Sequence, residues 1–201
     1  MLGELNSWLS DTPRDIPLEV SRLTGISAQL TAGRSIPWND LAERLTAATV
    51  VIAHHAEFER SFLRDFARDA RWACSMTHID WEAKGFRTRA LNYLAADHGF
   101  VNPFPHRALT DCLTTFRLVT PYLAELLENR TMPMILVQAF GSAYETKDQL
   151  RERRYRWNPG DRVWEKTILG RPEKIADERA WLAAITPNGT FTEVQDVGVA
   201  Q

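Results

Sequence analysis

The chain has 201 residues, of which 44% are hydrophobic and 25% charged, and its formal net charge at pH 7 is −2. This is the composition of an ordinary globular protein, with room for one main domain and a small appendage. It contains no apolar run long enough for a bilayer and no basic start followed by an apolar stretch, so we expect a cytoplasmic protein with no membrane partner. Its two cysteines, Cys74 and Cys112, are far apart, which argues against a disulfide framework or a zinc site.

The first part of the chain shows helical spacing of apolar residues, interrupted by one short β-branched run. This run, TVVIA at 49–53, predicts a buried strand, and the helices on either side of it make it part of an α/β layer. The helical patterns cover 16–30 (two short helices, the second capped by Ser27), 36–48, 57–70, 88–100 and 106–128, the last broken or kinked at Pro121; residues 72–81 are ambiguous.

The chain changes character near residue 131. The expected elements are a strand at 135–140, a short charged helix at 146–154, a hairpin at 155–168, and a last amphipathic helix at 174–185. From about Pro187 we expect frayed chain. The predicted organisation is therefore a first domain over 1–130, a small C-terminal module over 131–187, and a tail over 188–201.

Four polar residues crowd the end of the predicted buried strand, in the stretch AHHAEFER at 53–60. They are His54, His55, Glu57 and Glu59. The point where a buried strand opens into a helix is where α/β folds place their chemistry. The alternative is a solvated helix start, where acidic residues favour the helix dipole.

A second candidate motif is HRALTD, at 106–111. A helix start that carries His106 and then Asp111 would present a general base beside a metal ligand. Taken alone, this pair is also compatible with a purely structural role.

Together, the two motifs resemble a known family. AHHAEFERSFL resembles the second motif, AHNAxFDxxFL, of the DEDDh 3′–5′ exonucleases, and HRALTD resembles their third motif, HRAxxD. The likeness covers roughly residues 10–125 and is to the branch of the epsilon proofreading subunit of DNA polymerase III. It implies a ribonuclease H-like fold, a site for two Mg²⁺ or Mn²⁺ ions, and hydrolysis of phosphodiesters at nucleic-acid 3′ ends, with DNA as the expected partner.

The resemblance also implies residue roles. His106 would be the general base, and Asp111 and Glu59 would be metal ligands, although the family has Asp where this chain has Glu59. His55 stands where the family has Asn. The supporting motif residues would be His54, Phe58 and Arg107.

The family's first motif, a strand carrying D-x-E, does not precede these segments. The chain's D-x-E, Asp80-Trp81-Glu82, follows the second motif, and we interpret it as coincidence. We therefore expect an exonuclease fold lacking its first strands, an exposed edge on the 49–53 strand, and weak metal binding. The hypotheses are an impaired exonuclease from a truncated start, an inactive module that binds nucleic acid or a polymerase or other replication partner, and, more weakly, a structural α/β domain.

The C-terminal module carries a second, weaker resemblance. TKDQLRERRYRWNPGDRVWEK resembles small KD-x-x-K-x-x-G-x-x-W-x(n)-W modules attached to nucleic-acid enzymes, with Arg151 and Arg154 in place of the usual Lys and Gly. Exposed Trp and Arg would stack on bases. The alternative is that the two tryptophans form the hairpin's own small core. The candidate nucleic-acid contacts are Arg154, Arg156, Trp157 and Trp164.

Overall fold

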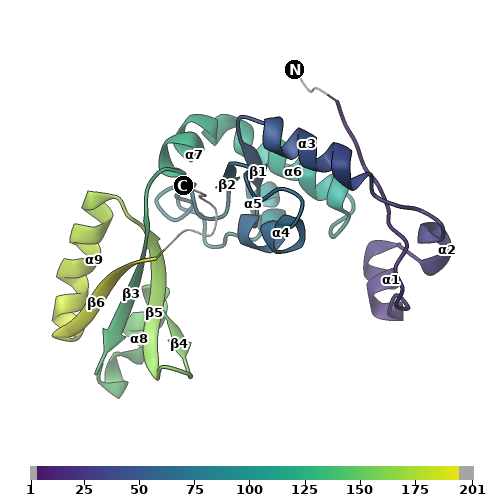
Figure 1. The fold of residues 1–201 in the computed structure, drawn as a ribbon. Helices are drawn as coiled ribbons and strands as arrows, with labels where there is room; N and C mark the ends of the chain where they lie inside the picture. Colours follow the sequence, from purple (N-terminus) through teal and green to yellow (C-terminus); the bar gives the residue numbers. More distant parts are fainter. Residues whose placement is uncertain (1–3, 195–201) are drawn as a thin grey trace. The chain divides into compact units, whose positions relative to one another are not determined.

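A computed structural model describes residues 4–194, which form a mixed α/β protein (Figure 1). The chain divides into two compact units between Leu127 and Glu128, close to the domain boundary that the sequence suggests. Unit 1 lies before this division and unit 2 after it. No helix within residues 4–194 is both long and apolar enough to cross a membrane.

Unit 1 is built mainly from short helices. Ser27 caps α2 as predicted, since its side chain accepts a hydrogen bond from the Leu30 amide. Pro121 lies in a 3₁₀ turn that separates α6 from α7, which confirms the predicted break. The helices are α1 (Leu18–Thr24), α2 (Ala28–Thr31), α3 (Trp38–Ala47), α4 (Ala56–Leu63), α5 (Leu91–Asp97), α6 (Ala108–Val119), η1 (Thr120–Tyr122) and α7 (Leu123–Asn129).

The sheet of unit 1 consists of two parallel strands, β1 (Val51–Ala53) and β2 (Trp72–Cys74). The strand predicted at 49–53 is thus confirmed over its last three residues, which are half-buried and not fully buried as expected, and the ambiguous stretch after residue 71 begins with its partner. Val51 donates to the Arg71 carbonyl and Ala53 accepts from the Ser75 amide, so the backbone groups of Ile52 point to the opposite edge. No described strand pairs with that edge, and the more specific ribonuclease H-like topology stays a prediction.

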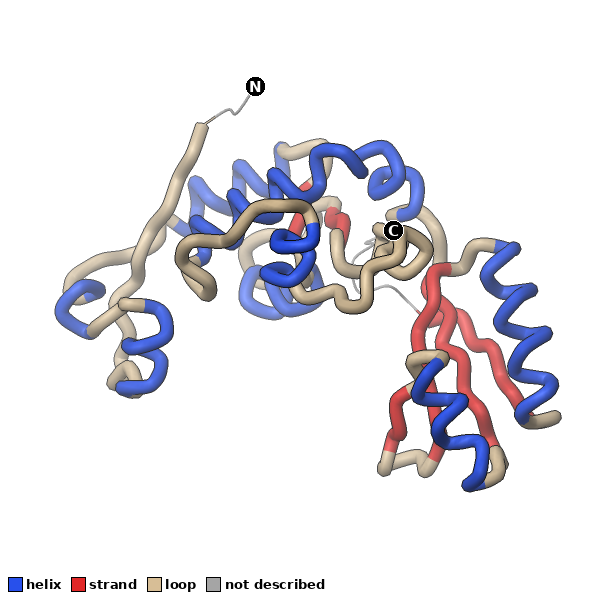
Figure 2. Tube along the Cα trace, turned by 180° about the vertical axis from the view of Figure 1, so that it is seen from behind, coloured by secondary structure: helices blue, strands red, loops and turns tan. Residues whose placement is uncertain are grey.

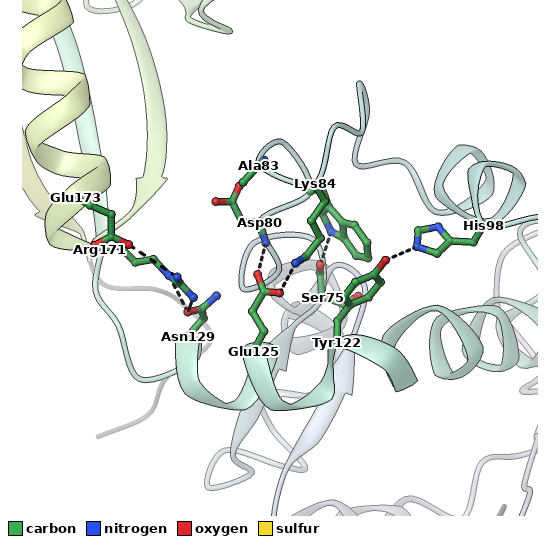
Figure 3. A network of polar contacts seen from close by, with 11 residues as sticks. Ser75, Asp80, Ala83, Lys84, His98, Tyr122, Glu125, Asn129, Arg171 and Glu173 are labelled. Atoms are coloured by element: carbon green, nitrogen blue, oxygen red, sulfur yellow. Dashed lines mark hydrogen bonds and ion pairs between the residues drawn. The ribbon is translucent and has the colours of Figure 1, made fainter.

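A core of large side chains and a polar network stabilise unit 1. Trp81, Leu94 and Leu118 are fully buried in this core. At its margin, Glu125 of α7 accepts a hydrogen bond from the Asp80 amide (3.0 Å) and pairs with the ammonium group of Lys84 at 2.6 Å (Figure 3). The network joins α7 to the loop after β2, although the two segments lie far apart in the sequence.

Unit 2 is an antiparallel sheet of order β4-β5-β3-β6 with two helices (Figure 2). Alternate residues of β3, among them Val137, form one core with Leu150 of α8 and Leu182 of α9, so both helices cover the same face. The strand, helix, hairpin and helix predicted from residue 135 onward are confirmed. The elements are β3 (Met134–Phe140), η2 (Tyr144–Thr146), α8 (Lys147–Glu152), β4 (Arg156–Asn158), β5 (Val163–Leu169), α9 (Pro172–Ile185) and β6 (Asn188–Val194).

The predicted tail is wrong for residues 188–194, because they form β6 and pair with the whole of β3. This edge strand has only two large apolar residues, Phe191 and Val194, so its hydrophobic pattern was too weak to predict it. Gly189 allows the strand to lie close to α9: a Cβ added there would lie 2.9 Å from Cγ of Leu182. The remainder of the predicted tail, residues 195–201, lies outside the described residues.

A buried carboxylate links α9 to the sheet of unit 2. Glu178 is 4% exposed and accepts a hydrogen bond from the Tyr155 hydroxyl at 2.8 Å. Lys166 and Arg153 both form ion pairs with the same carboxylate. Burial and the hydrogen bond to Glu178 raise the pKa of Tyr155. The Glu178 carboxylate thus has both a hydrogen-bond donor and positively charged partners, as a buried charge requires.

Candidate functional site

The two histidines after β1 have different environments. His54 is half-buried: its Nε2 donates to the Arg89 carbonyl at 2.7 Å, so its Nδ1 accepts from the Ser75 hydroxyl at 2.9 Å. Burial lowers the pKa of His54, which favours the neutral ring. His55 is exposed and stacks on Phe58, with ring centroids 5.8 Å apart. His54 therefore holds together the loops beside β1.

Glu59 and Asp111 lie near enough for the negative charge of Asp111 to act on the Glu59 carboxyl. Glu59 lies in α4 and Asp111 in the first turn of α6. Although Glu59 lies at the surface, partial desolvation of its carboxyl raises its pKa; His55 opposes this, and the negative charge of Asp111 raises the pKa further. Glu59 and Asp111, one from each of the two sequence motifs, are therefore electrostatic neighbours and form a carboxylate pair.

Two residues beside this pair, Asn102 and Cys112, are not indicated as site residues by the sequence motifs. Asn102 is buried, and its amide donates to Asp111 Oδ1 at 2.7 Å and to Asn92 Oδ1 at 3.2 Å. Cys112 follows Asp111, and desolvation, then Glu59 and Asp111, raise the pKa of its thiol. Asn102 fixes the Asp111 carboxylate, whereas the Cys112 sulfur stays a neutral thiol. No local pattern in the loop around Asn102 signals this tertiary contact.

The structure does not join the predicted general base to the carboxylate pair by any direct bond. His106 is exposed, and its imidazole makes no hydrogen bond or ion pair within the part of the chain that the structure describes. Its φ of 66° lies in the left-handed region, which is uncommon for a residue other than glycine. The adjacent Arg107 has a clear structural role: its Nη1 donates to the Thr24 carbonyl at 3.0 Å and ties the start of α6 to the end of α1.

The other supporting motif residue, Phe58, is 52% exposed and packs edge-on against Phe62 with ring centroids 5.0 Å apart. It belongs to an aromatic surface of α4 and not to the core of unit 1.

The donors at this site suit a hard divalent cation. Mg²⁺ in enzymes is bound by one or two carboxylates, water and substrate phosphates, and Glu59 with Asp111 supplies two such carboxylates. Among residues 4–194, no group of three or more His, Cys, Asp or Glu side chains is arranged to hold a metal ion. The chain would therefore offer a metal at this place two carboxylates.

The candidate contacts of unit 2 lie on and beside the β4–β5 hairpin. Trp157 and Trp164 are directly opposite each other, with ring centroids 5.7 Å apart, which confirms that they form the hairpin's own cross-strand pair. Arg151 lies over the ring of Trp164 at 5.5 Å. Trp157 nevertheless remains 49% exposed. Arg156 is also exposed on β4, whereas Arg154 precedes the strand with a left-handed φ of 69°.

Comparison with known proteins finds no family model that matches the chain, and no curated protein or solved structure with significant similarity to it.

Proposed function

We propose that unit 1 acts as a metal-dependent phosphodiesterase of the 3′–5′ exonuclease type, working on nucleic-acid 3′ ends, with DNA as the main substrate and the cytoplasm as its place of action. The observation that carries the proposal is the meeting of Glu59 and Asp111 from two motifs far apart in sequence. The negative charge of Asp111 helps to raise the pKa of Glu59, and a divalent ion bound by both carboxylates would relieve this repulsion.

In this proposal different residues bind the metal ion, accept a proton and position the site. Asp111, held by Asn102, and Glu59 would hold Mg²⁺ or Mn²⁺, which supplies Lewis-acid stabilisation of a phosphoryl oxygen when it is bound. His106, exposed at the start of α6, would accept the proton of the attacking water. His54 and Arg107 position the elements that carry these groups. With two carboxylates in place of the family's larger set, activity would be low.

The test is degradation of a 5′-labelled single-stranded DNA by the purified chain with Mn²⁺, read as a ladder shortened from the 3′ end. Asp111→Asn and His106→Ala should abolish the ladder. Glu57→Gln is the matched control, because Glu57 is an exposed carboxylate of the same helix. An absence of degradation by the folded wild-type chain, or equal degradation by Asp111→Asn, would contradict the proposal.

A second candidate function is nucleic-acid or replication-partner binding without cleavage, favoured by the half-exposed Trp157 in unit 2. An exposed indole with arginines nearby is a stacking platform for single-stranded bases. Trp157→Ala should weaken binding of a fluorescent single strand by about tenfold, since stacking contributes about 1–3 kcal/mol per base. Tyr144→Ala, which removes another exposed aromatic ring of unit 2, is the control. Equal affinity of the wild type and Trp157→Ala would rule this platform out.

A further inference from the structure

A small pocket at the carboxyl end of α4 combines a cationic rim with an apolar floor. Its volume is about 100 Å³. Three arginines spaced four residues apart provide the rim, and buried or half-buried apolar side chains provide the floor. The residues that line this arginine pocket are Arg60, Leu63, Arg64, Ala67, Arg68 and Trp72.

The arginines of the pocket have no carboxylate among the residues that line it, although Asp65 and Asp69 alternate with the arginines in sequence. None of the three guanidinium groups forms an ion pair with another residue in the described range 4–194. Moreover, Nη1 of Arg60 is shielded from solvent and has no hydrogen-bond partner there. Such a shielded, unpaired donor is unusual in native proteins and is expected to have a partner of its own.

Stabilisation of the helix end explains only part of this arrangement. The carboxyl terminus of a helix carries about half a negative charge, which favours arginines in the last turn. Arg60 occupies that turn of α4. However, Nη1 of Arg60 has no hydrogen-bond partner among the described residues, so this N–H group does not donate to the carbonyl groups at the end of α4. In addition, the three positive charges of the arginines exceed the partial negative charge of the helix end.

The size and chemistry of the pocket select one class of ligand. Pockets for drug-sized molecules have volumes of about 300–1,000 Å³, so a pocket three times smaller than the lower limit suits a single compact group. Guanidinium groups present paired N–H donors that match the oxygens of a phosphate. The apolar floor, which includes Trp72 with 3% exposure, lowers the local dielectric and strengthens such contacts.

We propose that the arginine pocket binds a phosphate group. The group comes either from the backbone of a nucleic-acid strand or from a free phosphate compound, and the recognition chemistry is the same for both. The inference does not depend on hydrolysis at Glu59 and Asp111, because the pocket is defined by its own residues.

The test is calorimetric titration of the whole chain with inorganic phosphate at constant ionic strength. We expect saturable binding by the wild type and a loss of about tenfold or more in affinity for Arg60→Gln, since one charge-assisted hydrogen bond is removed. Arg64→Gln, at the rim, should show a loss of the same kind. Arg14→Gln, an exposed arginine outside the pocket, should bind like the wild type. Absence of saturable binding, or an equal loss in Arg14→Gln, would overturn the proposal.

Two further measurements complete the design. Circular dichroism spectra and thermal midpoints identify any variant that fails to fold. If Arg60→Gln does not fold, the phosphate affinity of Arg64→Gln tests the proposal in its place, and the reverse also holds. Titration with a single-stranded oligonucleotide then distinguishes the sources of the phosphate. A parallel loss of oligonucleotide affinity in Arg60→Gln assigns the pocket to a nucleic-acid backbone. Loss of phosphate binding with unchanged oligonucleotide affinity assigns it to a free phosphate compound.

Discussion

The adjacent histidines after β1 give a sharp test of the structure, because within residues 4–194 the ring of His54 makes two hydrogen bonds and the ring of His55 makes none. His54→Ala removes hydrogen bonds of 2.9 Å and 2.7 Å to Ser75 and to the Arg89 carbonyl. A net value of about 1 kcal/mol for each bond, with the cost of the partners left unpaired, gives a destabilisation of unit 1 of about 2–4 kcal/mol. His55→Ala, at an exposed position, should change the free energy of unfolding by less than about 0.5 kcal/mol.

The assay is urea unfolding of the whole chain, with hydrogen exchange of the Val51 and Ser75 amides to follow unit 1 separately from unit 2. Equal effects of His54→Ala and His55→Ala would refute the structural role of His54.

The same histidine predicts how stability depends on pH. Because burial lowers the pKa of His54, the unfolded chain binds a proton near pH 6.5 and the folded chain binds it only at lower pH. Stability due to the neutral ring is therefore complete above pH 6.5 and is lost as the pH falls toward the lowered pKa. His54→Gln should flatten this part of the pH profile of unit 1.

Further predictions concern both units. Glu178→Ala should lower the free energy of unfolding of unit 2 by about 3–5 kcal/mol, because it removes the buried carboxylate that pairs with Lys166 and Arg153; urea unfolding followed at β3 amides measures this. Gly189→Ala should destabilise the same unit by about 1–3 kcal/mol through a clash with Leu182, visible as faster exchange of β6 amides. Mn²⁺ affinity should increase as the pH is raised from 4.5 through the raised pKa of Glu59, because the metal displaces a proton, and should then level off in calorimetric titrations.

Local signals in the sequence were sufficient for most helices and strands. The β-branched run at 49–53 marked β1, Pro121 marked the end of α6, and Asn-Pro-Gly-Asp marked the β4–β5 turn. Each of these signals acts within a few residues, through backbone restriction or the period of side-chain burial. The edge strand β6 lacks such a signal, because its stability comes from pairing with β3 and from the close approach that Gly189 permits.

The candidate site was predictable in part. The motif residues Glu59 and Asp111 were identified from the sequence, and in the structure the charge of Asp111 acts on Glu59, while their role as metal ligands stays a prediction. The role of Asn102 was not predictable, because its bond to Asp111 depends on how the preceding loop folds back on α6. The difference between His54 and His55 was also hidden, since burial of one ring depends on Ser75 and Arg89, which are distant in sequence.

The most direct test of the proposed function is a Mn²⁺ titration of the whole chain followed by electron paramagnetic resonance. It compares the wild type with Glu59→Gln, Asp111→Asn and the double variant, and uses Glu57→Gln as the control. If the two carboxylates hold one ion, the wild type and control bind Mn²⁺, each single variant loses most of the affinity, and the double variant loses less than the sum of the two single losses. Mn²⁺ binding that is unchanged in both single variants, or absent from the folded wild type, would contradict a metal site at this pair.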